Sequence, residues 1–121
     1  MEKEFVTYEL ALRMKALGFD EPCFNLYSFK TKEFMYTIPN VDEVVMFKYG
    51  NHNKTNHISA PTFSQAFRWF RGKYNIHIRI EKYDETKWWA NWGSWTSEVY
   101  DSYEEAELHC LEKLIEIVEN K

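Results

Sequence analysis

The sequence predicts an α+β domain in which three helices pack on an antiparallel sheet of four to six strands. Two observations lead to this prediction. Apolar residues recur at helical spacing in three segments, and between those segments they alternate with polar residues, as in strands that bury one face. The expected order is helix, hairpin, helix, hairpin, helix. With 121 residues, 45% of them hydrophobic, the chain is expected to form one domain, residues 1–121.

The first helix is expected over residues 7–17. Thr7 is a suitable N-cap, and Gly18 suits the left-handed position that ends a helix. Strands are expected next, because apolar residues gather in short runs between turn residues. These runs are residues 23–29 and 34–38, which form a hairpin, and residues 44–49. An exposed polar loop is expected at 50–56.

The second helix is expected over residues 61–73, with Ser59 or Ala60 at its cap and Pro61 in its first turn. Its apolar stripe consists of Phe63, Ala66, Phe67, Phe70 and Tyr74. A half-buried strand is expected at 75–83, because isoleucines alternate there with polar residues.

A second hairpin should follow this strand. Its two strands and its turn or bulge are expected at 86–90, 95–100 and 91–94. The last helix begins after Ser102, which forms a capping box with Glu105, and ends near Glu119. Its buried face is expected to contain Tyr103, Ala106, Cys110, Leu111, Leu114, Ile115 and Val118.

The predicted order also contains a weak internal repeat of a helix followed by a hairpin. Residues 11–14 (Ala-Leu-Arg-Met) match residues 66–69 (Ala-Phe-Arg-Trp) in residue type. Each match lies in an expected helix, and each helix is followed by a turn and strands.

Charge and targeting signals limit the classes of partner. Residues 61–90 carry six basic and three acidic side chains, whereas residues 91–121 carry two and eight, so general duplex-DNA binding is not expected. The charged N-terminus lacks the apolar run of a signal peptide, and no run reaches the ~20 apolar residues of a membrane helix. Cys23 and Cys110 lack metal-ligand spacing and are expected to be reduced, partly buried thiols in a cytoplasm.

Four of the five tryptophans lie within eight residues, at Trp88, Trp89, Trp92 and Trp95. Side chains alternate along a strand, so one of Trp88 and Trp89 should face the helices and the other should face outward. Trp92, at the turn, should be the most exposed. The outward-facing tryptophan either packs as an ordinary half-buried residue, forms a protein interface or stacks on a flat ligand. Its candidate neighbours are Arg79, Tyr83 and Tyr100.

The start of the second helix offers a candidate anion contact, made of Ser59, Thr62, Arg68 and Arg71. Helix N-termini attract anions, but capping by the hydroxyls, with the arginines in solvent, explains the same residues and is favoured. No metal site is expected, because His52 and His57 lack the third and fourth ligands that zinc requires.

No catalytic residue is assigned. The chain has no nucleophile elbow, zinc-protease motif, phosphate loop or dinucleotide fingerprint. We therefore expect a non-enzymatic protein without a cofactor. The alternative of an enzyme requires a pocket that gathers His77, Glu81 or His109 with a perturbed pKa.

Three segments resemble a group of short, uncharacterised proteins encoded by phages, prophages and mobile elements of gut bacteria. They are residues 7–12, 58–71 and 102–108. The resemblance implies a bacterial cytoplasm and a mobile-element origin, and it implies no activity and no site residues.

These observations together predict a small non-enzymatic binding or accessory protein of phage or prophage type. The expected partner is a protein, and a second copy of the chain is one candidate. Binding to a membrane is not expected. The first alternative is a nucleotide or a short single-stranded nucleic acid, bound by the exposed tryptophans and by Arg68, Arg71 or Arg79. The second alternative is the enzyme described above.

Overall fold

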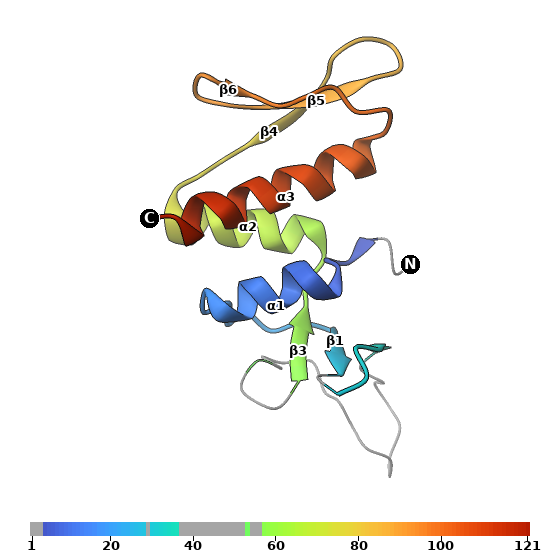
Figure 1. Ribbon diagram of the computed structural model, residues 1–121, viewed down its shortest axis with the longest axis vertical. Helices are drawn as coiled ribbons and strands as arrows, with labels where there is room; N and C mark the ends of the chain where they lie inside the picture. The colour runs from blue at the N-terminus through green and yellow to red at the C-terminus, as the bar shows by residue number, and fades with distance from the viewer. Residues whose placement is uncertain (1–3, 29, 37–52, 54–56) are drawn as a thin grey trace. The chain divides into compact units, whose positions relative to one another are not determined.

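A computed structural model describes residues 4–28, 30–36, 53 and 57–121 (Figure 1). The chain divides into two compact units, Met1–Thr62 and Phe63–Lys121, which we call the N-terminal and C-terminal units. The predicted α+β class and the three helices are confirmed. The prediction of a single sheet is wrong, because the described strands form two antiparallel sheets of three strands each. The predicted strand at 44–49 lies outside the described residues.

The N-terminal unit begins with helix α1, Tyr8–Ala16, whose two ends follow the prediction. The Leu10 N–H donates to Thr7 Oγ1 at 3.4 Å, which confirms the N-cap. Gly18 has a φ of 91°, and the N–H groups of Gly18 and Phe19 both donate back into the last turn, at 3.0 Å. This pair of bonds is a Schellman motif, which requires the left-handed residue that glycine supplies.

The sheet of the N-terminal unit has the order β2-β1-β3. Strands β1 (Asn25–Ser28) and β2 (Phe34–Tyr36) form the predicted hairpin within the described residues. Strand β3 (His57–Ala60) was not predicted, because its last three residues are all buried and no alternation marks it. Helix α1 packs on β3, and the most buried side chains include Met14, Leu26 and Ile58.

The C-terminal unit consists of α2 (Phe63–Tyr74), β4 (Arg79–Lys82), β5 (Trp88–Trp92), β6 (Trp95–Thr96) and α3 (Tyr103–Glu119). Its sheet has the order β4-β5-β6, and α3 packs on β4, β5 and α2. Figure 1 shows both helices on the same side of this sheet. The opposite side of the sheet carries no element of this unit.

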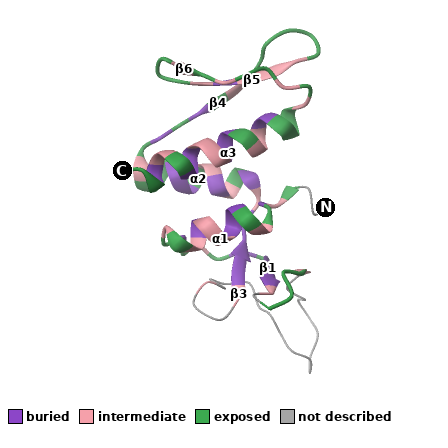
Figure 2. Cartoon of the chain, viewed as in Figure 1, coloured by how far each residue is buried: buried purple, intermediate pink, exposed green. Residues whose placement is uncertain are grey.

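The two helices of the C-terminal unit bury most of the residues that their periodicity predicts (Figure 2). In α3 the buried residues are Ala106, Cys110, Leu111, Leu114, Ile115 and Val118, as expected. Tyr103, expected on the same face, is 38% exposed. In α2 Trp69 is buried, although it lies outside the predicted stripe, and Phe67 and Tyr74 are only half-buried.

The strand predicted at 75–83 is shorter in the structure. Asn75, with a φ of 57°, ends α2 in the left-handed region, and the chain pairs with β5 only from Arg79. Ile76 and Ile78 are buried, but they precede the paired segment. The alternation of isoleucines with polar residues therefore predicted which side chains are buried, but it did not predict which residues pair in the sheet.

The internal repeat is not matched by the topology. In the N-terminal unit the first strand of the chain is central, in the order β2-β1-β3, whereas in the C-terminal unit the strands follow in sequence order. Similar helix patterns therefore precede sheets of different connectivity. None of the described helices combines the length and the apolar character needed to cross a membrane.

Candidate binding surface

The hairpin of β5 and β6 fixes the direction of each clustered tryptophan. Trp92 pairs with Trp95 across the two-residue turn Gly93-Ser94, and Gly93 has a φ of 59°. This turn is tighter than the expected 91–94, because Asn91 still pairs with Thr96. Glycine suits such a turn, which needs backbone conformations that other residues avoid.

A bulge follows this turn. Asn91 pairs with Thr96 and Trp88 with Tyr100, so three steps along β5 oppose four on the returning chain. The extra residue lies at Ser97-Glu98, where the Ser97 N–H donates to the Ala90 carbonyl at 2.9 Å and Ser97 Oγ accepts from the Ala90 N–H at 2.8 Å. A bulge of one residue reverses the face of every side chain beyond it.

The side of the sheet that carries Ala90 faces the helices, because Ala90 is fully buried. Trp88 and Trp92 share this side by alternation, and Trp95 shares it by pairing with Trp92. Trp88 meets Tyr103 of α3 edge to face, with ring centroids 5.1 Å apart. Lys113 of α3 lies over the ring of Trp95, 5.7 Å from its centroid.

None of the four clustered tryptophans is fully buried. Trp88, Trp89 and Trp95 are half-buried, and Trp92 is exposed at 36%, which confirms it as the most exposed of the four. Trp88, the one of the Trp88–Trp89 pair that faces the helices, is therefore only half-buried and is not a core residue. The buried tryptophan of this unit is Trp69 of α2.

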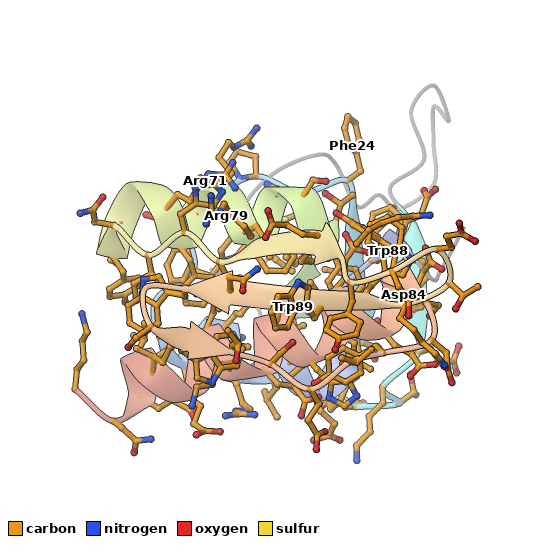
Figure 3. All side chains as sticks on the ribbon, turned by 90° about the horizontal axis from the view of Figure 1, so that it is seen from above. Phe24, Arg71, Arg79, Asp84, Trp88 and Trp89 are labelled. Atoms are coloured by element: carbon orange, nitrogen blue, oxygen red, sulfur yellow. The ribbon has the colours of Figure 1, made fainter. Side chains whose placement is uncertain are left out.

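The opposite side of the sheet, which we call the outer face, carries Trp89. Trp89 meets Tyr83 edge to face, with centroids 5.2 Å apart, and Tyr83 is 53% exposed. Val99, 41% exposed, lies on this face because its neighbour Tyr100 pairs with helix-facing Trp88. Figure 3 looks onto this face and shows Trp89 on β5.

Polar side chains accompany these apolar groups on the outer face. Arg79 and Glu81 alternate onto it from β4, opposite Asn91 and Trp89. The Asn91 side chain donates to Glu81 Oε1 at 2.6 Å. Arg79 therefore lies on the same face as Trp89, as expected.

Tyr100 is not on the outer face, which corrects the sequence prediction. Its ring stacks on His109 of α3, with centroids 4.8 Å apart and planes 8° from parallel. His109 Nδ1 lies 3.3 Å from Glu112. The bulge is the reason, because without the extra residue Tyr100 would face outward and Val99 inward.

A cleft of about 400 Å³ runs beside β4. We call it the β4 groove, and it is lined by Ser64, Phe67 and Arg71 of α2, by residues 77–81, and by Tyr103 and Glu107 of α3. Burial, with a smaller effect of nearby Glu104, raises the pKa of Glu107. Burial also raises the pKa of Tyr103. Sequence reasoning missed Glu107, which follows Tyr103 by one helical turn on the same face of α3.

The four residues of the predicted anion contact do not belong to one unit. Ser59 and Thr62 pair within the N-terminal unit, whereas Arg68 and Arg71 lie on α2. Ser59 lies in β3 of the N-terminal unit, 1% exposed, so it does not cap α2. Thr62 forms a bridge with Phe5 in that same unit. Arg68 and Arg71 are exposed on α2, and of these Arg71 shares the β4 groove with Arg79.

The described histidines and cysteines do not gather into a metal site. The carbonyl of His57 accepts from Lys15 Nζ at 2.9 Å, and His52 lies outside the described residues. No group of three potential metal ligands occurs among the described residues. Cys23 and Cys110 are both buried and are not joined in a disulfide, and burial raises the pKa of the Cys110 thiol to about 12.

Comparison with protein-family models, curated proteins and solved structures finds no match to this chain.

Proposed function

We propose that the protein is a small non-enzymatic binding protein of phage or prophage type that self-associates through the outer face of its C-terminal sheet. The observation that carries this proposal is the aromatic pair of Trp89 and Tyr83, which lies on that face together with Val99. Exposed aromatic side chains are enriched at the centres of protein interfaces, where they bury a large area at low entropic cost.

A second copy of the chain suits this face because its charges are self-complementary. Arg79 and Glu81 lie two residues apart on the same side of β4. Under two-fold symmetry, the surface that one copy offers meets the same surface of the other, so Arg79 of each copy can pair with Glu81 of its partner. Such pairs at the rim add specificity more than affinity.

The phage or prophage assignment is supported by the resemblance of residues 7–12, 58–71 and 102–108. On the same ground we propose a bacterial cytoplasm as the location of the protein. Two of these segments correspond to well-defined helical starts in the structure. Thr7 caps α1, and Ser102 Oγ accepts the Glu105 N–H at 3.1 Å at the start of α3.

Sedimentation velocity across a range of protein concentrations tests self-association. We expect a dimer that dissociates on dilution, and we expect Trp89→Ala to weaken it by about tenfold or more, or ~1.4 kcal/mol. Trp92→Ala is the matched control, since Trp92 is an exposed tryptophan of the same strand on the opposite side. A wild-type protein that stays monomeric at millimolar concentration would exclude the proposal.

The second candidate is binding of a nucleotide or a short single strand. It is favoured by one observation, that Trp89 and Arg79 share the outer face, so a base could stack while a phosphate meets the guanidinium. Titration of tryptophan fluorescence with mononucleotides and oligodeoxynucleotides tests it. Quenching that Trp89→Ala removes would support this candidate, and the absence of quenching at millimolar ligand would exclude it.

A further inference from the structure

Strand β4 lies at the edge of its sheet, and the direction of its backbone groups follows from the hydrogen bonds of β5. Trp88 exchanges both backbone hydrogen bonds with Tyr100, at 2.9 and 2.7 Å, so its N–H and C=O point away from β4. These directions alternate along an antiparallel strand. The residues of β5 that bond to β4 are therefore Trp89 and Asn91, opposite Glu81 and Arg79.

The remaining residues of β4, Ile80 and Lys82, point their backbone N–H and C=O groups away from β5. Within the described part of the chain, no hydrogen bond reaches these four groups. Unpaired groups of this kind form a template for another strand, and proteins usually cover or shorten such edges.

The β4 groove opens along this edge. Helix α2 contributes Phe67 and Arg71, and Ile78 and Ile80 contribute apolar surface from the strand side. Both α2 and β4 therefore contribute side chains to the lining of the groove. An added strand would therefore find hydrogen-bonding groups along one side and a mixed surface of apolar, basic and acidic side chains beside it, the acidic ones being Glu81 and Glu107.

The groove contains two guanidinium groups, together with the carboxyl groups of Glu107 and of Glu81, which accepts from the Asn91 side chain. Arg71 and Arg79 both line it, and Figure 3 shows their labelled side chains where α2 passes β4. Neither group forms an ion pair among the described residues. Arginine presents a planar fork of donors that matches a carboxylate, so two of them in one groove favour a bidentate acidic ligand.

We propose that the β4 groove binds an extended peptide segment of a partner protein, which adds as a strand to the free edge of β4 and places a carboxylate against Arg71 and Arg79. Strand addition supplies affinity through the backbone, and the arginines supply specificity for an acidic segment. The carboxylate comes from an acidic side chain or from a chain terminus. The inference goes beyond self-association through the outer face, and Arg79 is the one residue that both proposals use.

Selection from a random peptide library, presented with free C-termini, tests this proposal. The bait is the full chain carrying Trp89→Ala, at a concentration where it is monomeric, so the failure of self-association leaves the result unaffected. We expect enriched peptides with alternating β-branched residues and an acidic group at one fixed position. No enrichment would overturn the proposal.

Two kinds of variant then test the binding of the selected peptides. Ile80→Pro removes only an outward N–H, and proline is tolerated on edge strands; we expect it to abolish binding, whereas Ile80→Val retains it. If Ile80→Pro lowers the unfolding midpoint, Lys82→Pro removes the equivalent outward donor at an exposed position. Peptides that bind folded proline variants as tightly as the wild type would overturn strand addition.

The charge contact has its own matched variants. Arg71→Glu and Arg79→Glu should each weaken binding by about tenfold or more, whereas Lys121→Glu, with the same charge change outside the groove, should not. Amidating the C-terminus of the peptide, or replacing its acidic residue by the amide, identifies the source of the carboxylate. If both arginine variants bind the peptides as tightly as the wild type, the proposal that the arginines bind a carboxylate is wrong.

Discussion

Trp89 meets Tyr83 edge to face on the outer face of the C-terminal sheet, with ring centroids 5.2 Å apart and planes at 74°. One residue earlier, Trp88 meets Tyr103 in the same geometry on the opposite, helix-facing side. The dense tryptophan segment therefore contributes rings to both sides of the sheet. Trp88 packs against Tyr103 of α3, and Trp89 lies half-buried on the outer face.

This division predicts unequal losses of stability for two neighbouring substitutions. Trp88→Ala removes a half-buried ring that contacts α3, and it should lower the free energy of unfolding by about 1–2 kcal/mol. Trp89→Ala, which loses mainly the contact with Tyr83, should cost under about 1 kcal/mol. Urea denaturation at a concentration where both variants are monomeric measures the difference. Equal losses would place both rings in equivalent surroundings.

The buried thiol of Cys110 predicts slow alkylation and alkaline destabilisation. Its pKa is raised by burial from 9.0 to about 12 in the folded protein. Folding therefore favours the protonated thiol, and this stabilisation is complete below pH ~9 and is lost as the pH rises from about 9 towards 12. Iodoacetamide should modify Cys110 readily only after denaturation.

Cys110→Ala is the control for this pH dependence. The variant should lose less stability than the wild type between pH 9 and 12, although Tyr100 and Tyr103, whose pKa values are also raised by burial, contribute in the same direction. A wild-type protein whose stability falls no more steeply than that of Cys110→Ala would contradict the assignment.

The N-cap of α3 predicts a measurable loss of stability on removal. Ser102 Oγ accepts the Glu105 N–H at 3.1 Å, and Glu104 and Glu105 lie in the first turn. Ser102→Ala should cost about 1 kcal/mol, whereas Ser102→Asp should preserve the cap. Thermal unfolding followed by circular dichroism compares them. An alanine variant as stable as the wild type would show that the cap is not needed.

The turn between β4 and β5 predicts a change of stability at acid pH. Asp84 Oδ1 accepts the N–H groups of Thr86 and Lys87, both at 2.9 Å, and the bond from Thr86 is the main reason for its lowered pKa. Because the folded-state pKa is lowered, the carboxylate stabilises the fold above its ordinary pKa of 3.8, and this contribution is lost as the pH falls through the folded-state value. The advantage of the wild type over Asp84→Ala in melting temperature should therefore shrink below pH ~4, and a constant difference would contradict this role.

Elements with explicit end signals could be predicted from the sequence. Thr7 and Gly18 define α1, and Ser102 starts α3, because capping depends on residues within one turn of the helix end. Six of the seven predicted core positions of α3 followed from periodicity alone, and the seventh, Tyr103, is exposed. Strand β3 could not be found this way, because a four-residue strand with successive buried residues has no alternation to detect.

The outer face could be predicted only in part. Alternation correctly separates Trp88 from Trp89, but the bulge at Ser97-Glu98 exchanges the faces of Val99 and Tyr100, and nothing local in the sequence marks an inserted residue. The β4 groove could not be predicted from the sequence, for a different reason. It joins Arg71, Arg79 and Glu107 from three elements, and only the packing of those elements brings them together.

Fluorine NMR of the protein labelled with 5-fluorotryptophan tests the outer face most directly, because each of the five tryptophans gives one resonance that a Trp→Phe variant assigns. Self-association through the outer face predicts that, on dilution from millimolar to micromolar protein, the resonance of Trp89 shifts while those of Trp88 and Trp69 stay fixed. A Trp89 resonance that is unchanged over this range would contradict the account.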